Sequence, residues 1–76
     1  MTRLPAISGK QVLRALKKAG FSLHHVTGSH HVMERQSPDR RAVVVPVHGN
    51  RDLPIGTLRA IIKQSGMSDE DFIALL

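Results

Sequence analysis

The sequence predicts an α+β fold, a two-layer sandwich in the order α-β-β-β-α with one further short helix at the end. Two observations lead to this prediction. Amphipathic helical patterns lie towards both ends of the chain, and three short segments of β-forming residues, separated by turn residues, lie between them. Because short loops join the three segments, they should pair as an antiparallel meander, and both helices can then cover one face. The other face of the three-stranded sheet is left open.

The first helix is expected over about Gly9–Ala19. Ser8 is a suitable N-cap, and Gly20 is a suitable stop just after the helix. At about 100° per residue, one arc of this helix is apolar and the opposite arc is basic. The apolar arc contains Val12, Leu13, Ala15, Leu16 and Ala19, and the basic arc contains Lys10, Arg14, Lys17 and Lys18. The pattern predicts a helix that buries one face and presents a positive stripe to solvent.

Three strands should follow this helix. We expect them over Phe21–Val26, Ser29–Arg35 and Ala42–Val47, with Thr27-Gly28 as the turn between the first two. The third segment contains a run of β-branched residues, which favours a strand. Pro46 lacks an N–H group, so it indicates either an edge strand or the last paired residues of the strand.

Two more helices complete the fold. The longer one should begin around Pro54–Thr57 and end at Gly66. Its apolar face contains Ile55, Leu58, Ile61 and Ile62. Ser68 then caps a short terminal helix, SDEDFIALL, whose acidic first turn suits the helix dipole.

Length and composition limit the class of protein. A chain of 76 residues forms one domain, residues 1–76, and its apolar share of 41% is enough for one small core. The absence of cysteine excludes disulfides and thiolate-ligated zinc. Residues 1–10 lack the apolar run of a signal peptide, and no stretch approaches the roughly 18 apolar residues of a membrane span. We therefore expect a cytoplasmic protein without a membrane segment.

The charge is unevenly distributed along the chain. Eleven Lys and Arg residues face six Asp and Glu residues, and three of the six acids are consecutive, at positions 69–71. Residues 1–68 therefore carry a local net charge of +8. A field of this sign favours polyanions, with nucleic acid first and an acidic protein second. The alternative is that the positive charge only keeps a small protein soluble.

Four of the five histidines fall between residues 24 and 31. In the second predicted strand, alternation places His30 on one face of the sheet and His31 on the other. Adjacent histidines therefore cannot act together. Which of them points to the open face is not decided by the periodicity, because Val32 and Met33 are both suitable core residues.

Neither a zinc site nor a Ser–His nucleophile fits these histidines. No H-x3-H or HExxH spacing occurs, and the carboxylates near the cluster are limited to Glu34. A Ser–His pair would also need an orienting acid and an oxyanion hole, and neither is apparent. RNA transesterification, in contrast, needs only a base for the 2′-OH and positive charge for the phosphate. Imidazole suits this role, because a pKa of about 6.5 leaves the ring partly neutral in the cell.

Positive charge for such a reaction is present on both long helices. Gly56-Thr57, at the start of the second one, also offers free backbone N–H groups to a phosphate. Gly28 allows a phosphate or another backbone to approach closely, and Ser29 adds a small hydroxyl. The candidate cations are Lys10, Arg14, Lys17 and Lys18 on the first helix and Arg59 and Lys63 on the second.

Three segments together resemble a known family. They are SGKQVLRALKKAGF, GSHHVMER and VVVPVHGNRDLPIGTLRAIIKQSGMSDEDF, which span about Ile7 to Phe72. The sequence resembles the HicA (YcfA-like) mRNA interferase toxins of bacterial and archaeal toxin–antitoxin pairs. Three motifs carry the resemblance: glycine-serine-histidine at the start of the second strand, proline-x-histidine at the end of the third, and glycine-threonine-leucine at the start of the next helix.

The resemblance implies a double-stranded-RNA-binding-domain-like fold and the toxin of a type II toxin–antitoxin pair. It further implies cleavage of mRNA without a metal or other cofactor, and inhibition by a HicB antitoxin. The functional histidine of the family follows a glycine-serine or glycine-glycine pair, which matches His30. His31 is the reserve, and His48, at the proline-x-histidine position, is a second candidate group. His24 and His25 do not belong to the pattern.

Other functions remain open on the residues alone. A non-catalytic RNA-binding domain would have the same fold and the same basic stripes. Thr57–Leu76 could be a DNA-binding helix-turn-helix, but its recognition helix would begin with three acids, so we expect no direct DNA binding. The open face could also bind a protein partner, which we would expect to contact Val43–Val47.

The aromatic content limits how RNA could be bound. The chain contains only Phe21 and Phe72, and no Tyr or Trp, so it has no platform on which bases could stack. Contacts to phosphates and to the 2′-OH would then supply the affinity. We expect weak sequence preference and strong salt dependence.

Overall fold

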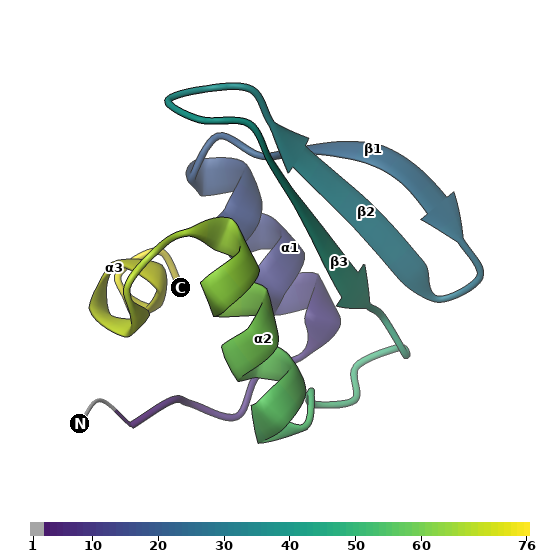
Figure 1. Ribbon diagram of the computed structural model, residues 1–76. Coiled ribbons are helices and arrows are strands. Elements are labelled where there is room, and N and C mark those ends of the chain that lie inside the picture. Colours follow the sequence, from purple (N-terminus) through teal and green to yellow (C-terminus); the bar gives the residue numbers. More distant parts are fainter. Residues whose placement is uncertain (1–2) are drawn as a thin grey trace.

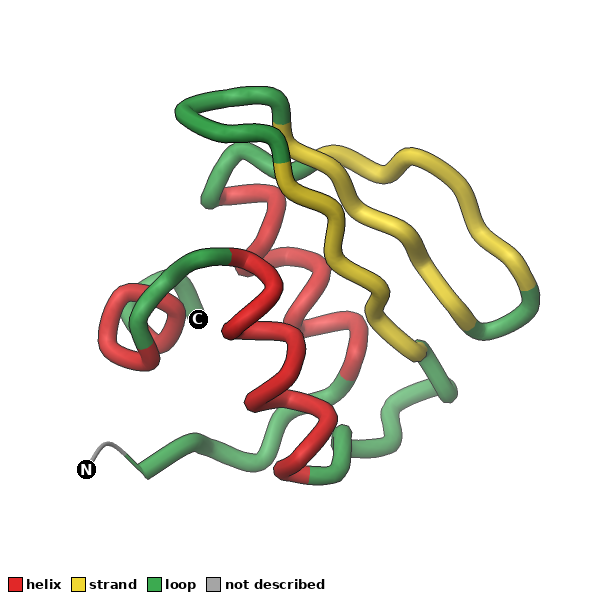
Figure 2. Tube along the Cα trace, viewed as in Figure 1, coloured by secondary structure: helices red, strands yellow, loops and turns green. Residues whose placement is uncertain are grey.

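The computed structural model of the protein describes residues 3–76 and confirms the α+β class. Its elements in chain order are α1 (Gly9–Lys18), β1 (Ser22–Thr27), β2 (His30–Arg35), β3 (Arg41–Pro46), α2 (Ile55–Ser65) and α3 (Asp69–Ile73). The strands form one antiparallel sheet in the order β1-β2-β3. Helices α1 and α2 lie on one side of this sheet (Figures 1 and 2). This is the arrangement of a double-stranded-RNA-binding-domain-like fold.

The ends of α1 and α2 fall where the local signals predict them. Ser8 caps α1: its Oγ accepts from the Gln11 backbone N–H, and the Gln11 side chain accepts from the Ser8 N–H at 2.9 Å. This reciprocal pair is a capping box. Gly20, with φ +94°, follows α1, and Gly66, with φ +78°, ends α2 in the left-handed region. Glycine adopts these conformations at no steric cost, which explains the two stops.

The core lies between the sheet and the two long helices. Met33, at the centre of β2, is fully buried, so its face of the sheet is the one that the helices cover. His31 and Arg35 share that face by alternation, whereas His30 lies on the open face. The other apolar residues of the core that are at most 1% exposed are Val12, Ala15, Leu16, Val43, Val45, Leu58, Ile61 and Phe72.

The turn between β1 and β2 lies one residue later than predicted. Thr27 pairs with His30, so the two turn residues are Gly28 and Ser29 rather than Thr27 and Gly28. Gly28 has φ +58°, and no residue other than glycine has a positive φ among those described. A positive φ at the first turn residue alone is typical of a type II′ turn, whose twist suits a hairpin. Strand β1 therefore ends one residue later than predicted, and β2 begins one residue later than predicted.

Strand β1 is an edge strand that extends beyond the helices (Figure 1). All six of its residues are exposed, including Leu23 and Val26 at 49% and 48%. The pairing with β2 shifts between Leu23 and His25, which leaves His24 as the extra residue of a β-bulge. The shift brings two consecutive histidines, His24 and His25, to the same open face of the sheet.

Candidate functional site

His30 is the first residue of β2 and lies directly after the Gly28-Ser29 turn. Its cross-strand partner is Pro46, the last residue of β3. The Ser29 carbonyl accepts a 2.7 Å hydrogen bond from the Val47 N–H, which fixes the turn against the end of β3. The His30 side chain is exposed and makes no hydrogen bond or ion pair with any of residues 3–76. A neutral ring in this position is free to accept a proton from a bound molecule.

His31 has a different environment. It is partly buried on the helix-facing side of the sheet, and its Nδ1 lies 3.3 Å from the Ser29 carbonyl oxygen. A carbonyl can only accept, so this contact is a hydrogen bond when Nδ1 carries the proton. The ring thereby supports the turn that precedes His30. His30 and His31 therefore point to opposite faces of the sheet, so they cannot contact the same bound molecule from one face.

His48 and Arg51 stand at the two ends of one tight turn. The Arg51 N–H donates to the His48 carbonyl at 3.1 Å, and Gly49 within the turn has φ +57°. The Cα atoms of the first and fourth residues of such a turn lie within about 7 Å of each other. The following residues are fixed to the start of α1, because the Leu53 N–H donates to the Ile7 carbonyl at 2.8 Å. The turn is thus anchored beside the end of β3.

A groove of about 280 Å³ lies at this turn. Pro46, the strand partner of His30, forms part of its wall, so the groove borders the end of β3 that pairs with His30. Helix α2 starts at the groove, and no side chain caps its first turn. The groove is lined by Pro46, His48, Arg51, Asp52, Leu53, Pro54 and Thr57.

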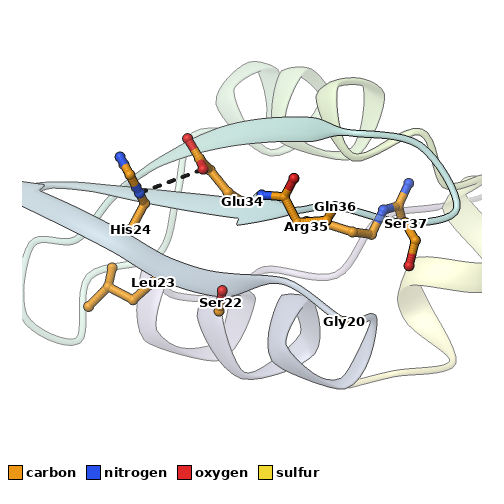
Figure 3. A pocket seen from close by; sticks show the side chains of 8 residues that line it. All are labelled: Gly20, Ser22, Leu23, His24, Glu34, Arg35, Gln36 and Ser37. Atoms are coloured by element: carbon orange, nitrogen blue, oxygen red, sulfur yellow. Dashed lines mark ion pairs between the residues drawn. The ribbon is translucent and has the colours of Figure 1, made fainter.

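The two histidines of β1 lie near a second cavity, at the opposite end of the hairpin. This cavity has a volume of about 420 Å³ and extends from Gly20 to Ser37 around His24 and Glu34. The His24 Nδ1 is 3.6 Å from a Glu34 carboxylate oxygen, and both side chains point to the same side of the strands, opposite to Leu23 (Figure 3). The rings of His24 and His25 meet edge to face at 5.1 Å. His24 therefore interacts with both His25 and Glu34.

The structure separates the predicted cations from one another. Lys17 and Lys18 lie in the last turn of α1, and Lys63 lies in the last turn of α2, at the opposite ends of these helices from Lys10 and from the groove. The Lys18 Nζ donates to the Leu75 carbonyl at 3.0 Å. Arg59 forms an ion pair with Asp69 at 3.8 Å, and Arg14 lies midway along α1.

Lys10 lies in the first turn of α1, next to the end of β3. It follows Gly9, the first residue of α1, which packs against the Pro46 carbonyl and the Val47 side chain. Gly28 and Ser29 form the turn directly before His30. Of the predicted groups, the structure thus gathers Gly28, Ser29 and His30, with His48 and Lys10 near the end of β3.

Arg51 did not emerge from the sequence as a residue of the site. It lines the groove together with His48 and with Thr57, which the sequence places at the start of the second long helix. The signal for Arg51 was its place in the loop HGNRD, three residues after the histidine of the proline-x-histidine motif. A four-residue turn there would have placed the two side chains together.

Within residues 3–76, no group of three or more His, Asp or Glu side chains is arranged to hold a metal ion. None of the helices in this range is both long enough and apolar enough to span a bilayer.

The fold and the site define a small basic α+β domain with an exposed histidine directly after a tight turn, and with a groove lined by Arg51 and Asp52 at the end of β3. A family model described as the HicA toxin of bacterial toxin–antitoxin systems matches residues 9–67, and the chain belongs to this family. The match includes the turn, His30, the groove and α2. A search of curated proteins yields no match. Membership of a toxin–antitoxin family implies an antitoxin as the partner of this chain.

Proposed function

We propose that the protein is the toxin of a type II toxin–antitoxin pair and an endoribonuclease that cleaves mRNA, with His30 as the catalytic base. The observation that carries this proposal is the exposed ring of His30, on the open face directly after the Gly28-Ser29 turn, in a chain of the HicA toxin family. Groups that only support the fold are usually packed or hydrogen-bonded, whereas His30 is neither. The cytoplasm, where mRNA is found, would be the site of action.

The reaction would be an internal transesterification. Neutral His30 takes the proton from a ribose 2′-OH, and the 2′-oxygen forms a bond to the adjacent phosphorus. The bond from phosphorus to the 5′-oxygen of the next nucleotide breaks, and that oxygen takes up a proton. The products are a 2′,3′-cyclic phosphate and a 5′-OH end, and no metal takes part. His48 is the second candidate group, because its turn lies beside the end of β3.

The partner that restrains this activity would be a HicB-type antitoxin. The local charge of +8 over residues 1–68 favours an acidic protein, which would compete with RNA for the same basic surface. Of the predicted contact segment Val43–Val47, residues Val43 and Val45 are buried under the helices. Val44, which is 43% exposed, and Pro46 lie on the open face and would be available to the antitoxin.

Cleavage of a labelled mRNA by the purified protein in the presence of EDTA tests the proposal. His30→Ala should slow cleavage by roughly 100-fold or more, since a general base contributes about 10²–10⁴. His25→Ala is the matched control, because His25 is an exposed histidine of the same face outside the site, and it should leave the rate unchanged. His31→Ala and His48→Ala then rank the other two candidates. Full activity of His30→Ala would refute His30 as the base.

The second candidate is a non-catalytic RNA-binding domain. The fold favours it equally, since double-stranded-RNA-binding domains bind RNA without cleaving it. The same assay separates the two functions. Salt-dependent binding by the wild-type protein, without any 2′,3′-cyclic phosphate product at high protein concentration, would establish the second function and exclude the first.

A further inference from the structure

We propose that Arg51 binds a phosphodiester group of the RNA in the groove beside His30, and so supplies the positive charge that cleavage requires. This inference rests on the proposed function and assigns a role to a residue of that site. The ligand is the sugar–phosphate backbone of single-stranded RNA, next to the bond that His30 acts on.

The need for a cation follows from the reaction. Attack of the 2′-oxygen adds negative charge at a phosphorus close to His30, and preorganised positive groups near that point lower the barrier. His30 itself becomes positive only after it has taken the proton. A second group must therefore lie within reach of the end of β3.

The three arginines of the sheet and of α2 all form ion pairs with aspartates. Arg35 and Arg41 lie opposite each other in the pairing of β2 with β3, at the end of these strands away from His30. Both form ion pairs with Asp39. Arg59 pairs with Asp69 on α3. These side chains stabilise the fold at positions remote from His30.

Arg51 differs from these arginines in two respects. Its side chain is exposed and makes no hydrogen bond or ion pair with any of residues 3–76. It also lines the groove whose wall is Pro46, the strand partner of His30. Asp52 lines the same groove, but no ion pair joins its carboxylate to Arg51. The guanidinium is thus available to a ligand.

The shape and chemistry of the groove suit one unit of an RNA backbone. A guanidinium forms two parallel hydrogen bonds with phosphate oxygens, and the turn places the imidazole of His48 beside it. Pro46, Leu53 and Pro54 supply an apolar wall for a ribose. A volume of about 280 Å³ is below the usual size of a pocket for a whole drug-like molecule. The groove would accept the sugar and phosphate without reading the base.

The first test measures binding without cleavage. In a His30→Ala background, affinity for a labelled single-stranded RNA is measured over a series of salt concentrations, with and without Arg51→Ala. Loss of one phosphate contact should weaken binding at low salt and reduce the slope of log K against log salt by about 0.7. Arg40→Ala is the matched control, because Arg40 is exposed in the β2–β3 loop at the other end of the sheet. Equal slopes for the two variants would overturn the proposal.

The second test measures cleavage in the otherwise wild-type protein. Arg51→Ala should lower kcat/KM by roughly 10- to 100-fold, about the loss of one charge-assisted contact in the transition state. Arg51→Lys should recover only part of this loss, because a lysine cannot form the bidentate contact. Arg40→Ala should cleave at the wild-type rate. Thermal unfolding at the wild-type temperature would show that all three variants are folded.

The outcomes distinguish this inference from the proposed function. If the wild-type protein cleaves RNA and Arg51→Ala behaves like Arg40→Ala, the role of Arg51 is wrong and the proposed function stands. If the wild-type protein neither binds nor cleaves RNA, the proposed function fails, and the inference fails with it.

Discussion

Asp39, in the loop between β2 and β3, illustrates what one residue contributes to the fold. Its carboxylate accepts from the Arg41 Nε at 2.6 Å and from an Arg35 guanidinium nitrogen at 2.9 Å. Desolvation alone raises the pKa of Asp39, but the hydrogen bonds and charges of Arg41 and then Arg35 outweigh it and lower the pKa below 3.8. The folded protein thus favours the ionised carboxylate and joins the ends of two strands through it.

Replacement of this carboxylate should make stability depend less on pH. Because the folded pKa lies below the unfolded value, Asp39 contributes stability above pH 3.8, and this contribution is lost as the pH falls through the folded pKa. Asp39→Asn should therefore have a lower Tm than the wild type at neutral pH, with a small difference because Asp39 is half exposed. The Tm values should converge once the pH has fallen below the pKa of Asp39 in the folded protein. Arg40→Gln, in the same loop, changes the net charge by one unit in the opposite direction, and its difference from the wild type should not vanish in this way at low pH. A constant difference at all pH values would contradict the role of the carboxylate.

The side chains of the site also show which features a sequence can predict at this scale. Alternation correctly separates His30 from His31, because the pleat requires it. It does not identify the open face, since Val32 and Met33 are both apolar, and only the burial of Met33 under the helices decides it. The bulge at His24 could not be predicted from the sequence either, because it depends on how β1 pairs with β2. Contacts that depend on tertiary packing therefore remain open.

At the scale of elements, the start of α1 is fixed against the end of β3. Gly9 is buried there, and a Cβ at this position would overlap the Pro46 carbonyl oxygen and press on Val47. The sequence predicts the helix start from Ser8 but not this close approach. The close approach of α1 to the end of β3 explains why a glycine lies in the first turn of the helix.

Gly9→Ala should destabilise the protein. Overpacking of a closely packed site costs about 1–3 kcal/mol, which urea denaturation can measure as a lower midpoint. Gly56→Ala, in the first turn of α2, is the matched control, because nothing lies within 4 Å of its added Cβ. That control should be neutral or more stable by up to about 1 kcal/mol, since alanine favours helix. Similar midpoints for both variants would refute the close packing of α1 on β3.

Helix α3 lies beyond the matched residues 9–67 and yet belongs to the core. Ser68 caps it by accepting from the Asp71 N–H at 3.1 Å, and Phe72 is completely buried. The capping signal predicts where this helix begins. Its single aromatic side chain determines where it packs.

Removal of this aromatic side chain should cost far more than removal of an exposed neighbour. Phe72→Ala should lower the free energy of unfolding by about 3–5 kcal/mol, as expected for a buried Phe. Leu76→Ala, where the side chain is 46% exposed, should change it by about 0.5 kcal/mol or less. Chemical denaturation of both variants gives the comparison. A small effect of Phe72→Ala would mean that α3 does not stabilise the fold.

At the scale of the whole molecule, the predicted cations are spread over the length of the helices. The order of elements and their layers could be predicted, because caps, turns and periodicity are local signals. The positions of the cations relative to His30 could not be, because they depend on how each helix runs past the sheet. Both α1 and α2 start at the end of the sheet where β2 begins, so Lys10 lies at that end of the molecule, whereas Lys17, Lys18 and Lys63 lie in the last turns of their helices, towards the other end (Figure 1).

This arrangement predicts that the contribution of each cation to RNA binding decreases along the basic stripe of α1, from its first turn to its last. Lys10, Arg14 and Lys17 follow one another on one side of the helix, and at 1.5 Å per residue Lys17 lies about 10 Å farther along than Lys10. The Debye length at physiological salt is about 8 Å, so Lys17 is largely screened from a phosphate bound near the start of α1. Alanine variants in the His30→Ala background should therefore weaken binding of a four-nucleotide RNA most at Lys10 and least at Lys17.

A comparison of a short RNA with a longer one tests whether the RNA is positioned at the groove. A four-nucleotide RNA bound at the groove has few phosphates to contact α1, whereas a longer strand can run along the whole stripe and contact Lys17 directly. The gradient measured with the short RNA should therefore flatten with an RNA of about 20 nucleotides, as each added phosphate contact contributes to the salt dependence. If the short RNA shows equal losses at Lys10, Arg14 and Lys17, the RNA is not positioned by the end of the molecule that contains His30 and Arg51.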